Sequence, residues 1–426
     1  MYFFKTNLAI VFTLLITISL PAQSDKDLKP VFIEAEAFFF YEEYEEALPL
    51  YLTLIKEMPY NFNVVYRAGV CYLNIPYSKH KAVKYLEEAS GKINTEFKKS
   101  KFKEIGAPPE ALFYLGEAYR VNRRYREAVQ AYNEFLDYID LEVYSISRIH
   151  LSIAAAQNAM AFENRHQVVE KENLGEPVNS SFNERNAIVS GNGKMIVFTR
   201  ELQFYDAAFF AYKGDDGNWE EPQNFMPVLK VDNDLYPTSV SYDGTEVYFY
   251  RNDEFDGNIY MTSYKNGAWQ ELRKLNDNIN TKYWESHASI NKEGDKLYFT
   301  SNRENEGDNL DIFVSQRLPD GEWDVPEKLG IVVNSPFNEN TPFISPDGKT
   351  LYFSSEGHLN TGGYDIFCSE LVDGEWSKPQ NMGYPINSPD DDLFFVPAEI
   401  PNTGYMVLQE NTSLGRSDVY KIKILD

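Results

Sequence analysis

A glycine followed two residues later by a tryptophan recurs four times in the second half of the chain. The four tripeptides are Gly217-Asn218-Trp219, Gly267-Ala268-Trp269, Gly321-Glu322-Trp323 and Gly374-Glu375-Trp376, so the tryptophans are 50, 54 and 53 residues apart. Ahead of each tripeptide lies a turn glycine followed by an alternating apolar segment: Gly193, Gly244, Gly294 and Gly348 precede MIVFTR, EVYFYR, KLYFTS and TLYFSS. A period near 50 residues predicts an array of copied modules.

Each module can hold four short strands separated by polar turns, which is the make-up of a β-propeller blade. In the fourth module the strands are expected at 341–345, 350–355 and 364–371, with a last strand around Trp376. Five such modules follow one another from about residue 174 to residue 426. The sequence therefore favours five closed blades over a six-bladed ring with one divergent blade or an open array.

The fifth module contains three strands and lacks the outer one, which would leave a strand edge exposed. Residues 166–175 resemble the outer strands of other modules, for example residues 375–383. We therefore expect the propeller to comprise residues 166–426, with a strand from its N-terminal side completing the last blade.

The run SPDGKTLYFSS at 345–355, followed by DIF at 365–367, resembles the Pro-Asp repeats of TolB-type propellers from bacterial envelopes. The match is clearest in the third and fourth modules and weaker in the first and fifth. The resemblance agrees with the propeller predicted from the period.

Residues 28–165 have apolar positions at helical spacing and carry a different repeat. Gly116 and Tyr119, followed by Ala128 and Tyr132, match the pattern of a tetratricopeptide repeat. The small residues let two antiparallel helices approach closely, and the tyrosines fill the space beside them. Two more copies of this frame occur upstream, so the segment resembles the tetratricopeptide family.

That resemblance implies a short helical superhelix with a concave peptide-binding face. The groove positions of the family correspond here to Phe32, Phe39, Tyr66, Phe113, Glu117 and Arg120. The aromatic residues among them could equally belong to the core between helices, and the chain's own linker could fill so short a groove. The expected fold is multidomain, α + all-β, with tetratricopeptide helical repeats followed by a β-propeller.

The N-terminus has the features of an export signal. Lys5 precedes an apolar run from Leu8 to Leu20, and small residues follow it. We expect residues 1–22 to be a signal peptide, with a retained N-terminal anchor as the alternative. No other segment approaches the length of a membrane span.

The composition and the motifs of the chain argue against several kinds of partner and site. A formal net charge of −25 repels phosphate backbones, so nucleic acid is not expected as a partner. Cys71 and Cys368 lie in different predicted domains, which argues against a disulfide framework or a metal cage. No zinc-binding histidine motif, nucleophile elbow or P-loop occurs. We therefore expect no catalytic residues, no metal and no cofactor.

Acidic residues leave open two alternatives to a protein without a metal or a catalytic site: a calcium site and a glycosidase site. Those near blade starts are Asp232, Asp234, Asp390, Asp391 and Asp392, and carboxylates there could hold Ca²⁺, although no calcium-loop motif is present. Five-bladed propellers also house glycosidases with paired carboxylates in the channel. An aspartate recurs in the third strand of several blades, as a structural residue would: Asp311, Asp365 and Asp418.

The order of signal peptide, tetratricopeptide repeats and propeller resembles the N-terminal half of OmpA-associated envelope proteins of Bacteroidetes-type secretion and gliding machinery. The OmpA-like domain of that family is not found here, so attachment to peptidoglycan does not carry over. The resemblance implies a non-catalytic scaffold in the periplasm, peripherally associated with the outer membrane. Its partners would be envelope proteins: an outer-membrane barrel, an adhesin or an OmpA-like protein. The rival interpretation is a glycan-binding or glycoside-hydrolysing propeller.

Overall fold

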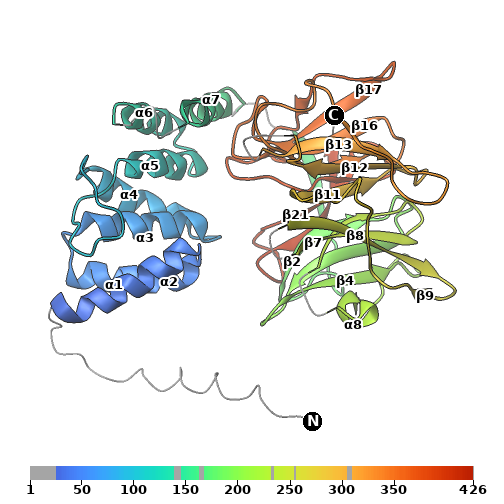
Figure 1. Cartoon of the computed structure of the whole chain (residues 1–426), viewed down its shortest axis with the longest axis horizontal. Coiled ribbons are helices and arrows are strands. Elements are labelled where there is room, and N and C mark those ends of the chain that lie inside the picture. The colour runs from blue at the N-terminus through green and yellow to red at the C-terminus, as the bar shows by residue number, and fades with distance from the viewer. Residues whose placement is uncertain are drawn as a thin grey trace, which may run out of the picture. The chain divides into compact units, whose positions relative to one another are not determined.

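The computed structural model describes residues 25–138, 145–162, 167–231, 235–253, 256–304 and 309–425. The predicted signal peptide, residues 1–22, lies outside the described residues. The chain divides into two compact units, Met1–Ser145 and Ile146–Asp426 (Figure 1). The first contains helices and the second contains a five-bladed β-propeller, which confirms the predicted order of a helical region and a propeller.

The boundary between the units lies earlier than the predicted position between residues 165 and 166. Helix α7 (Ile146–Phe162) belongs to the second unit, because its side chains bond to the propeller. Two hydrogen bonds of 2.9 and 2.6 Å join the guanidinium of Arg148 to the carboxylate of Glu356. In addition, Asn158 Nδ2 donates to the carbonyl oxygen of Asn360 at 2.9 Å. These contacts join residues about 200 positions apart in the sequence. The spacing of apolar residues within α7 could therefore not predict them.

The helices of the first unit pack in consecutive pairs. They are α1 (Asp25–Phe40), α2 (Tyr44–Glu57), α3 (Phe62–Asn74), α4 (Ala82–Ser90), α5 (Glu110–Val121) and α6 (Tyr125–Leu136), with a 3₁₀ turn at Lys79–Lys81. Helix α3 begins at Phe62 because the side chain of Asn61 accepts from the amide of Val64. Gly116 meets Tyr132 so closely that an added Cβ would lie 2.4 Å from the ring. Glycine at this position therefore sets the spacing of α5 and α6.

The second unit consists of five antiparallel sheets, and each forms one blade. The first two blades are β2 (Asn183–Val189), β3 (Met195–Glu201), β4 (Asp206–Tyr212) and β5 (Gln223–Asn224), then β6 (Tyr236–Val240), β7 (Glu246–Asp253), β8 (Asp256–Lys265) and β10 (Arg273–Lys274). The next two are β11 (Glu285–Ile290), β12 (Lys296–Ser301), β13 (Asp311–Gln316) and β14 (Glu327–Lys328), then β15 (Glu339–Ile344), β16 (Thr350–Ser355), β17 (Asp365–Val372) and β19 (Gln380–Asn381). The fifth is β20 (Val396–Pro397), β21 (Thr403–Leu408), β22 (Asp418–Leu425) and β1 (Val168–Asn173).

The fourth blade differs in one respect from the prediction. Trp376 belongs to β18 (Glu375–Trp376), which extends the hairpin of β17, and the outer strand of the sheet is β19, four residues later. Blade two has the equivalent extension, β9 (Ala268–Trp269). A short helix, α8 (Phe225–Leu229), follows the outer strand of blade one and was not predicted.

The repeated glycines and tryptophans have separate structural roles. The turn glycines all have positive φ, which glycine adopts without steric cost: 69° at Gly193, 78° at Gly244, 74° at Gly294 and 70° at Gly348. The glycine of each Gly-x-Trp also has positive φ, and its tryptophan packs on a blade core, with Trp323 fully buried. The motif is therefore a turn followed by a core anchor.

The ring is closed by strands from opposite ends of the second unit. Strand β1 pairs with β22 in antiparallel register from Val168 opposite Leu425 to Asn173 opposite Tyr420. A strand that precedes the first blade thus supplies the outer strand of the fifth. This pairing protects the edge of β22 that would otherwise be exposed.

An asparagine at the start of four blades clasps the preceding blade. Its Oδ1 accepts from the backbone amide of a residue in the third strand of that blade, and its Nδ2 donates to the carbonyl of the same residue. The four pairs are Asn179 with Val419, Asn280 with Ile259, Asn334 with Ile312 and Asn387 with Ile366. All four asparagines are buried, so the clasp satisfies backbone groups that water cannot reach.

A carboxylate five residues after each of these asparagines accepts hydrogen bonds from the serine or threonine that follows the asparagine. The four pairs are Glu184 with Ser180, Glu285 with Thr281, Glu339 with Ser335 and Asp392 with Ser388. The four segments that carry these pairs are NSSFNE at 179, NTKYWE at 280, NSPFNE at 334 and NSPDDD at 387. Each one therefore bonds to the preceding blade and stabilises the turn at the start of its own blade.

Candidate binding face of the propeller

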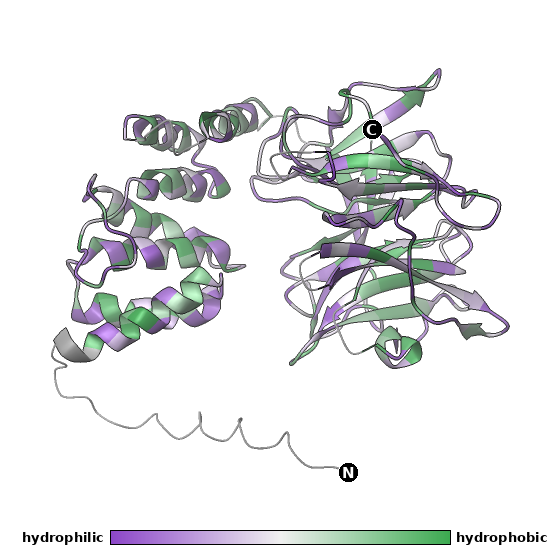
Figure 2. Ribbon diagram, in the orientation of Figure 1, coloured by the Kyte–Doolittle hydropathy of each residue, from purple (hydrophilic) through white to green (hydrophobic). Residues whose placement is uncertain are grey.

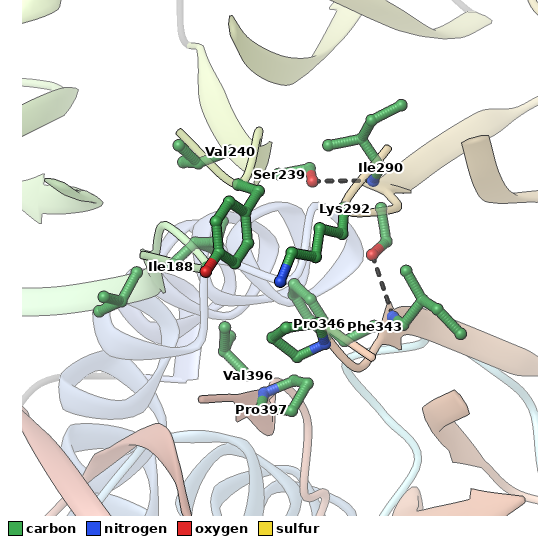
Figure 3. A pocket seen from close by; sticks show the side chains of 14 residues that line it. Ile188, Ser239, Val240, Ile290, Lys292, Phe343, Pro346, Val396 and Pro397 are labelled. Atoms are coloured by element: carbon green, nitrogen blue, oxygen red, sulfur yellow. Dashed lines mark hydrogen bonds between the residues drawn. The ribbon is translucent and has the colours of Figure 1, made fainter. Parts of the chain in front are cut away.

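The inner strands of all five blades surround a small cavity on the propeller axis (Figure 3). Its wall is mostly aliphatic or aromatic, with Ile188, Val240, Ile290, Phe343 and Val396 supplied by five different blades. Bonds between neighbouring inner strands also line it, such as Ile290 N–H to Ser239 Oγ at 3.0 Å. The cavity volume is about 40 Å³, which has room for a few water molecules.

The charged groups at one mouth of the cavity bond to one another. Lys292 Nζ lies 4.2 Å from the centre of the Tyr242 ring and 3.8 Å from Glu399 Oε1. The Tyr242 hydroxyl donates to the same Glu399 oxygen at 2.6 Å. These three residues come from blades two, three and five, so the cluster ties three blades together at this end. Among the described residues that line the cavity, Lys292 is the one with a charged side chain.

A series of aromatic contacts joins blades two, three and five near the starts of their inner strands. The Tyr250 ring centre lies 6.2 Å from that of Tyr236, 5.6 Å from that of Trp284 and 6.1 Å from that of His287. The His287 ring in turn meets the edge of Phe394 at 5.4 Å. Burial lowers the pKa of His287 to about 4, so its imidazole is neutral near pH 7.

Exposed aromatic residues of blades one and three lie on the face of the propeller where the inner strands start. Because the strands of each blade are antiparallel, the start of an inner strand and the turn between the second and third strands lie on the same face. Phe182 and Tyr283 each precede an inner strand, and Phe204 and Tyr205 form the turn between β3 and β4. The exposed fractions of Phe182, Tyr283, Phe204 and Tyr205 are 42, 40, 86 and 49%. We call these four residues the aromatic face.

The acidic residues considered as a calcium site have structural partners where the structure describes them. Asp391 Oδ1 accepts from the Tyr364 amide, and the carbonyl of Asp390 accepts from the Gly363 amide. Both bonds hold the long turn of blade four. Burial and the charge of Asp365 raise the pKa of Asp392 well above the usual value. Asp232 and Asp234 lie outside the described residues. Within the described ranges, no three His, Cys, Asp or Glu side chains are grouped to hold a metal ion.

The aspartate repeated in the third strands is buried and holds its own blade together. Asp365 accepts from the amide and hydroxyl of Thr361, and Asp418 accepts from the amide of Leu414. In blade three, Lys328 Nζ lies 2.6 Å from an oxygen of Asp311. These contacts agree with a structural role for the repeated residue.

The six groove residues expected in the helical unit lie mostly between helices. Phe32, Tyr66 and Arg120 are 1, 6 and 6% exposed, so burial leaves them no surface for a partner to contact. The physical reason is that helical spacing cannot distinguish an open groove from the contact with the next helix. For the two aromatic residues, this burial agrees with the alternative of a place in the core between helices.

The other three groove residues are partly buried and contact their neighbours. The Phe39 ring lies under the guanidinium of Arg67 at 4.3 Å, and Phe113 contacts the ring of Tyr132 at 5.7 Å. The carboxylate of Glu117 accepts from the Tyr132 hydroxyl and pairs with Arg120. Their role in binding stays a prediction. Sequence reasoning missed the aromatic face, although Phe182 and Tyr283 lie in the segments NSSFNE and NTKYWE that start two of the blades.

The chain matches no protein-family model and no curated protein. Among solved structures, it is similar to the putative TolB of Agrobacterium tumefaciens, with 14% identity over 58% of this chain and 78% of that chain and a TM-score of 0.37. TolB from Acinetobacter baumannii gives 15% identity over 66% and 71%, with a TM-score of 0.35. The α-L-arabinofuranosidase PaAbf62A of Podospora anserina gives 10% identity over 59% and 92%, with a TM-score of 0.35.

No described helix is long and apolar enough to cross a membrane.

Proposed function

We propose that this protein is a non-catalytic scaffold that binds other proteins through the aromatic face of its propeller. The observation that carries the proposal is the group of four exposed aromatic residues on one face of the propeller, Phe182, Phe204, Tyr205 and Tyr283. Exposed Phe and Tyr side chains are the residues that anchor protein interfaces.

The predicted export signal and the resemblance to envelope proteins support a place for this scaffold in the periplasm, associated peripherally with the outer membrane. An outer-membrane barrel, an adhesin or an OmpA-like protein in a secretion, gliding or surface complex would be the partner. The acidic charge of the chain suits an exported, soluble scaffold.

Site-specific cross-linking tests the proposal. A photoreactive residue in place of Tyr205, which is 49% exposed, should cross-link in cells to one or a few defined envelope proteins. The double substitution Phe204→Ser and Tyr205→Ser should abolish recovery of the same proteins from solubilised envelopes. A matched control, Val325→Ser with Val372→Ser, removes exposed apolar residues from the turns at the other end of the third strands and should leave recovery unchanged. Equal recovery with all three chains would contradict the proposal.

Glycan binding is the second candidate, favoured by the exposed rings, since aromatic rings can stack on the apolar faces of sugars. Binding of purified protein to envelope polysaccharides, lost in the Phe204→Ser, Tyr205→Ser double variant, would favour it over protein binding. Release of reducing sugars would show that the protein is an enzyme and would contradict the scaffold proposal.

A further inference from the structure

Helix α1 is apolar on two opposite sides. From Leu28 to Phe40 it has three charged residues among thirteen, and hydrophobic positions occur along it in Figure 2. One side, with Leu28, Phe32, Ala35 and Phe39, faces the core shared with α2 and α3. A helix that is apolar all round normally has neighbours on all sides.

The other side of α1 is exposed. Its positions are 30, 33, 37 and 40, which follow one another at helical spacing and lie opposite the buried positions 28, 32, 35 and 39. Ile33 is 57% exposed, Phe40 is 76% exposed and Tyr41, which follows the helix, is 72% exposed. We call Pro30, Ile33, Ala37, Phe40 and Tyr41 the outer stripe of α1.

Acidic side chains border the outer stripe. Between Lys29 and Glu46 the sequence has one basic and six acidic residues. The carboxylate of Glu36 pairs with Arg67 and accepts from the hydroxyl of Tyr51, so this residue belongs to the core side of α1. The remaining five are exposed: Glu34, Glu42, Glu43, Glu45 and Glu46. A second copy of this surface would bring like charges together, which disfavours pairing with itself.

We propose that the outer stripe of α1 binds an amphipathic helix of a partner protein whose apolar side is flanked by lysine or arginine. The apolar residues of the stripe supply a seam for the partner's apolar side, and the surrounding glutamates attract its basic flanks. This inference deepens the proposed scaffold function and rests on it. The stripe lies in the helical unit, so its failure and the failure of the aromatic face can be told apart by separate variants.

Two labelled synthetic helices of equal length test the proposal with the purified full-length chain. Both have leucines at helical spacing, and the remaining positions are lysine in one and glutamate in the other. Fluorescence anisotropy should detect binding of the lysine helix and not of the glutamate helix. Raising the salt concentration should weaken the binding, since exposed charges are screened.

Matched variants locate the binding. Ile33→Ser with Phe40→Ser should weaken binding of the lysine helix about tenfold or more, because two exposed apolar contacts are lost. Val325→Ser with Val372→Ser, which removes exposed apolar residues of the propeller, should leave it unchanged. Glu42→Lys with Glu43→Lys should weaken it while the fold, checked by circular dichroism, is retained.

Three results would overturn the proposal. The first is equal affinity of the wild-type chain and the Ile33→Ser, Phe40→Ser variant for the lysine helix. The second is a dimer of the wild-type chain that becomes monomeric in that variant, which would make a second copy the occupant. The third is binding only after removal of residues 1–22, which would make the chain's own N-terminal segment the occupant.

Discussion

At the scale of single residues, Glu339 and its equivalents in two other blades are buried carboxylates with different charged neighbours. Glu184 lies 2.9 Å from the guanidinium of Arg200, and Glu285 lies 3.3 Å from that of Arg303. Glu339 accepts from the hydroxyls of Ser335 and Ser355, and the ring of His358 lies 4.0 Å from its carboxylate. Burial raises the pKa of Glu339 to about 7 and also raises the pKa of Glu184.

The raised pKa predicts a pH dependence of stability. Glu339 has a pKa of 4.5 in the unfolded chain and about 7 in the folded chain, so between these values the folded state binds more protons. Its contribution to stability is present below pH 4.5 and is lost as the pH rises through about 7. Glu339→Gln should flatten the fall in the free energy of unfolding across this range, measured by urea denaturation.

Two histidines, His358 and His287, bear on the comparison of Glu339→Gln with the wild-type chain. His358 Nε2 lies 4.0 Å from Glu339 Oε1, so His358→Gln should be measured alongside. The lowered pKa of His287 acts in the opposite direction, with stability lost as the pH falls from 6.5 through about 4, and it is common to all variants. Exposed Glu370 provides a control, since Glu370→Gln should keep the wild-type slope. An unchanged slope in Glu339→Gln would refute the assignment.

At the scale of elements, the clasping asparagines determine how blades join. The side chain of Asn334 bonds to both backbone groups of Ile312 and to the Leu329 carbonyl, at 2.8, 3.0 and 2.7 Å. Asn334→Ala would leave these buried groups without their partner. We expect a loss of about 3 kcal/mol in the free energy of unfolding, measured by chemical denaturation.

An asparagine outside the clasp serves as the comparison. Asn218 lies in an exposed turn and bonds to the side chain of Asp216. Asn218→Ala should cost about 0.5 kcal/mol or less. Similar losses for the two substitutions would show that the clasp is not what stabilises the contact between blades.

At the scale of the whole molecule, the fifth blade depends on strands about 250 residues apart. Val169 of β1 packs into the core of this blade, whereas neighbouring Val168 is 63% exposed. Val169→Asp should cost about 3 kcal/mol and expose the edge of β22, so that the protein aggregates on mild heating, as light scattering would detect. Val168→Asp should behave like the wild-type chain. Equal behaviour of the two variants would mean that β1 does not close the ring.

Much of the fold could be predicted because its signals are local and repeated. The turn glycines, the alternating strands and the period near 50 residues appear in four of the five blades, and β16 has the predicted bounds of 350–355. Gly116 and Tyr132 likewise indicated a close helix pair. Such signals can be read from the sequence because each strand or helix must form its own backbone hydrogen bonds and bury its own apolar side.

The tertiary structure alone decided which of these side chains remain exposed. Phe32 and Ile33 are both apolar residues of the same helix, yet Phe32 is 1% exposed and Ile33 is 57% exposed. In the same way, only the packing of five blades shows that His287 is enclosed by rings and that Phe204 is open to solvent. The sequence by itself determined the elements and their repetition. Accessibility, and with it the candidate binding surfaces, depends on contacts between distant segments that no local pattern records.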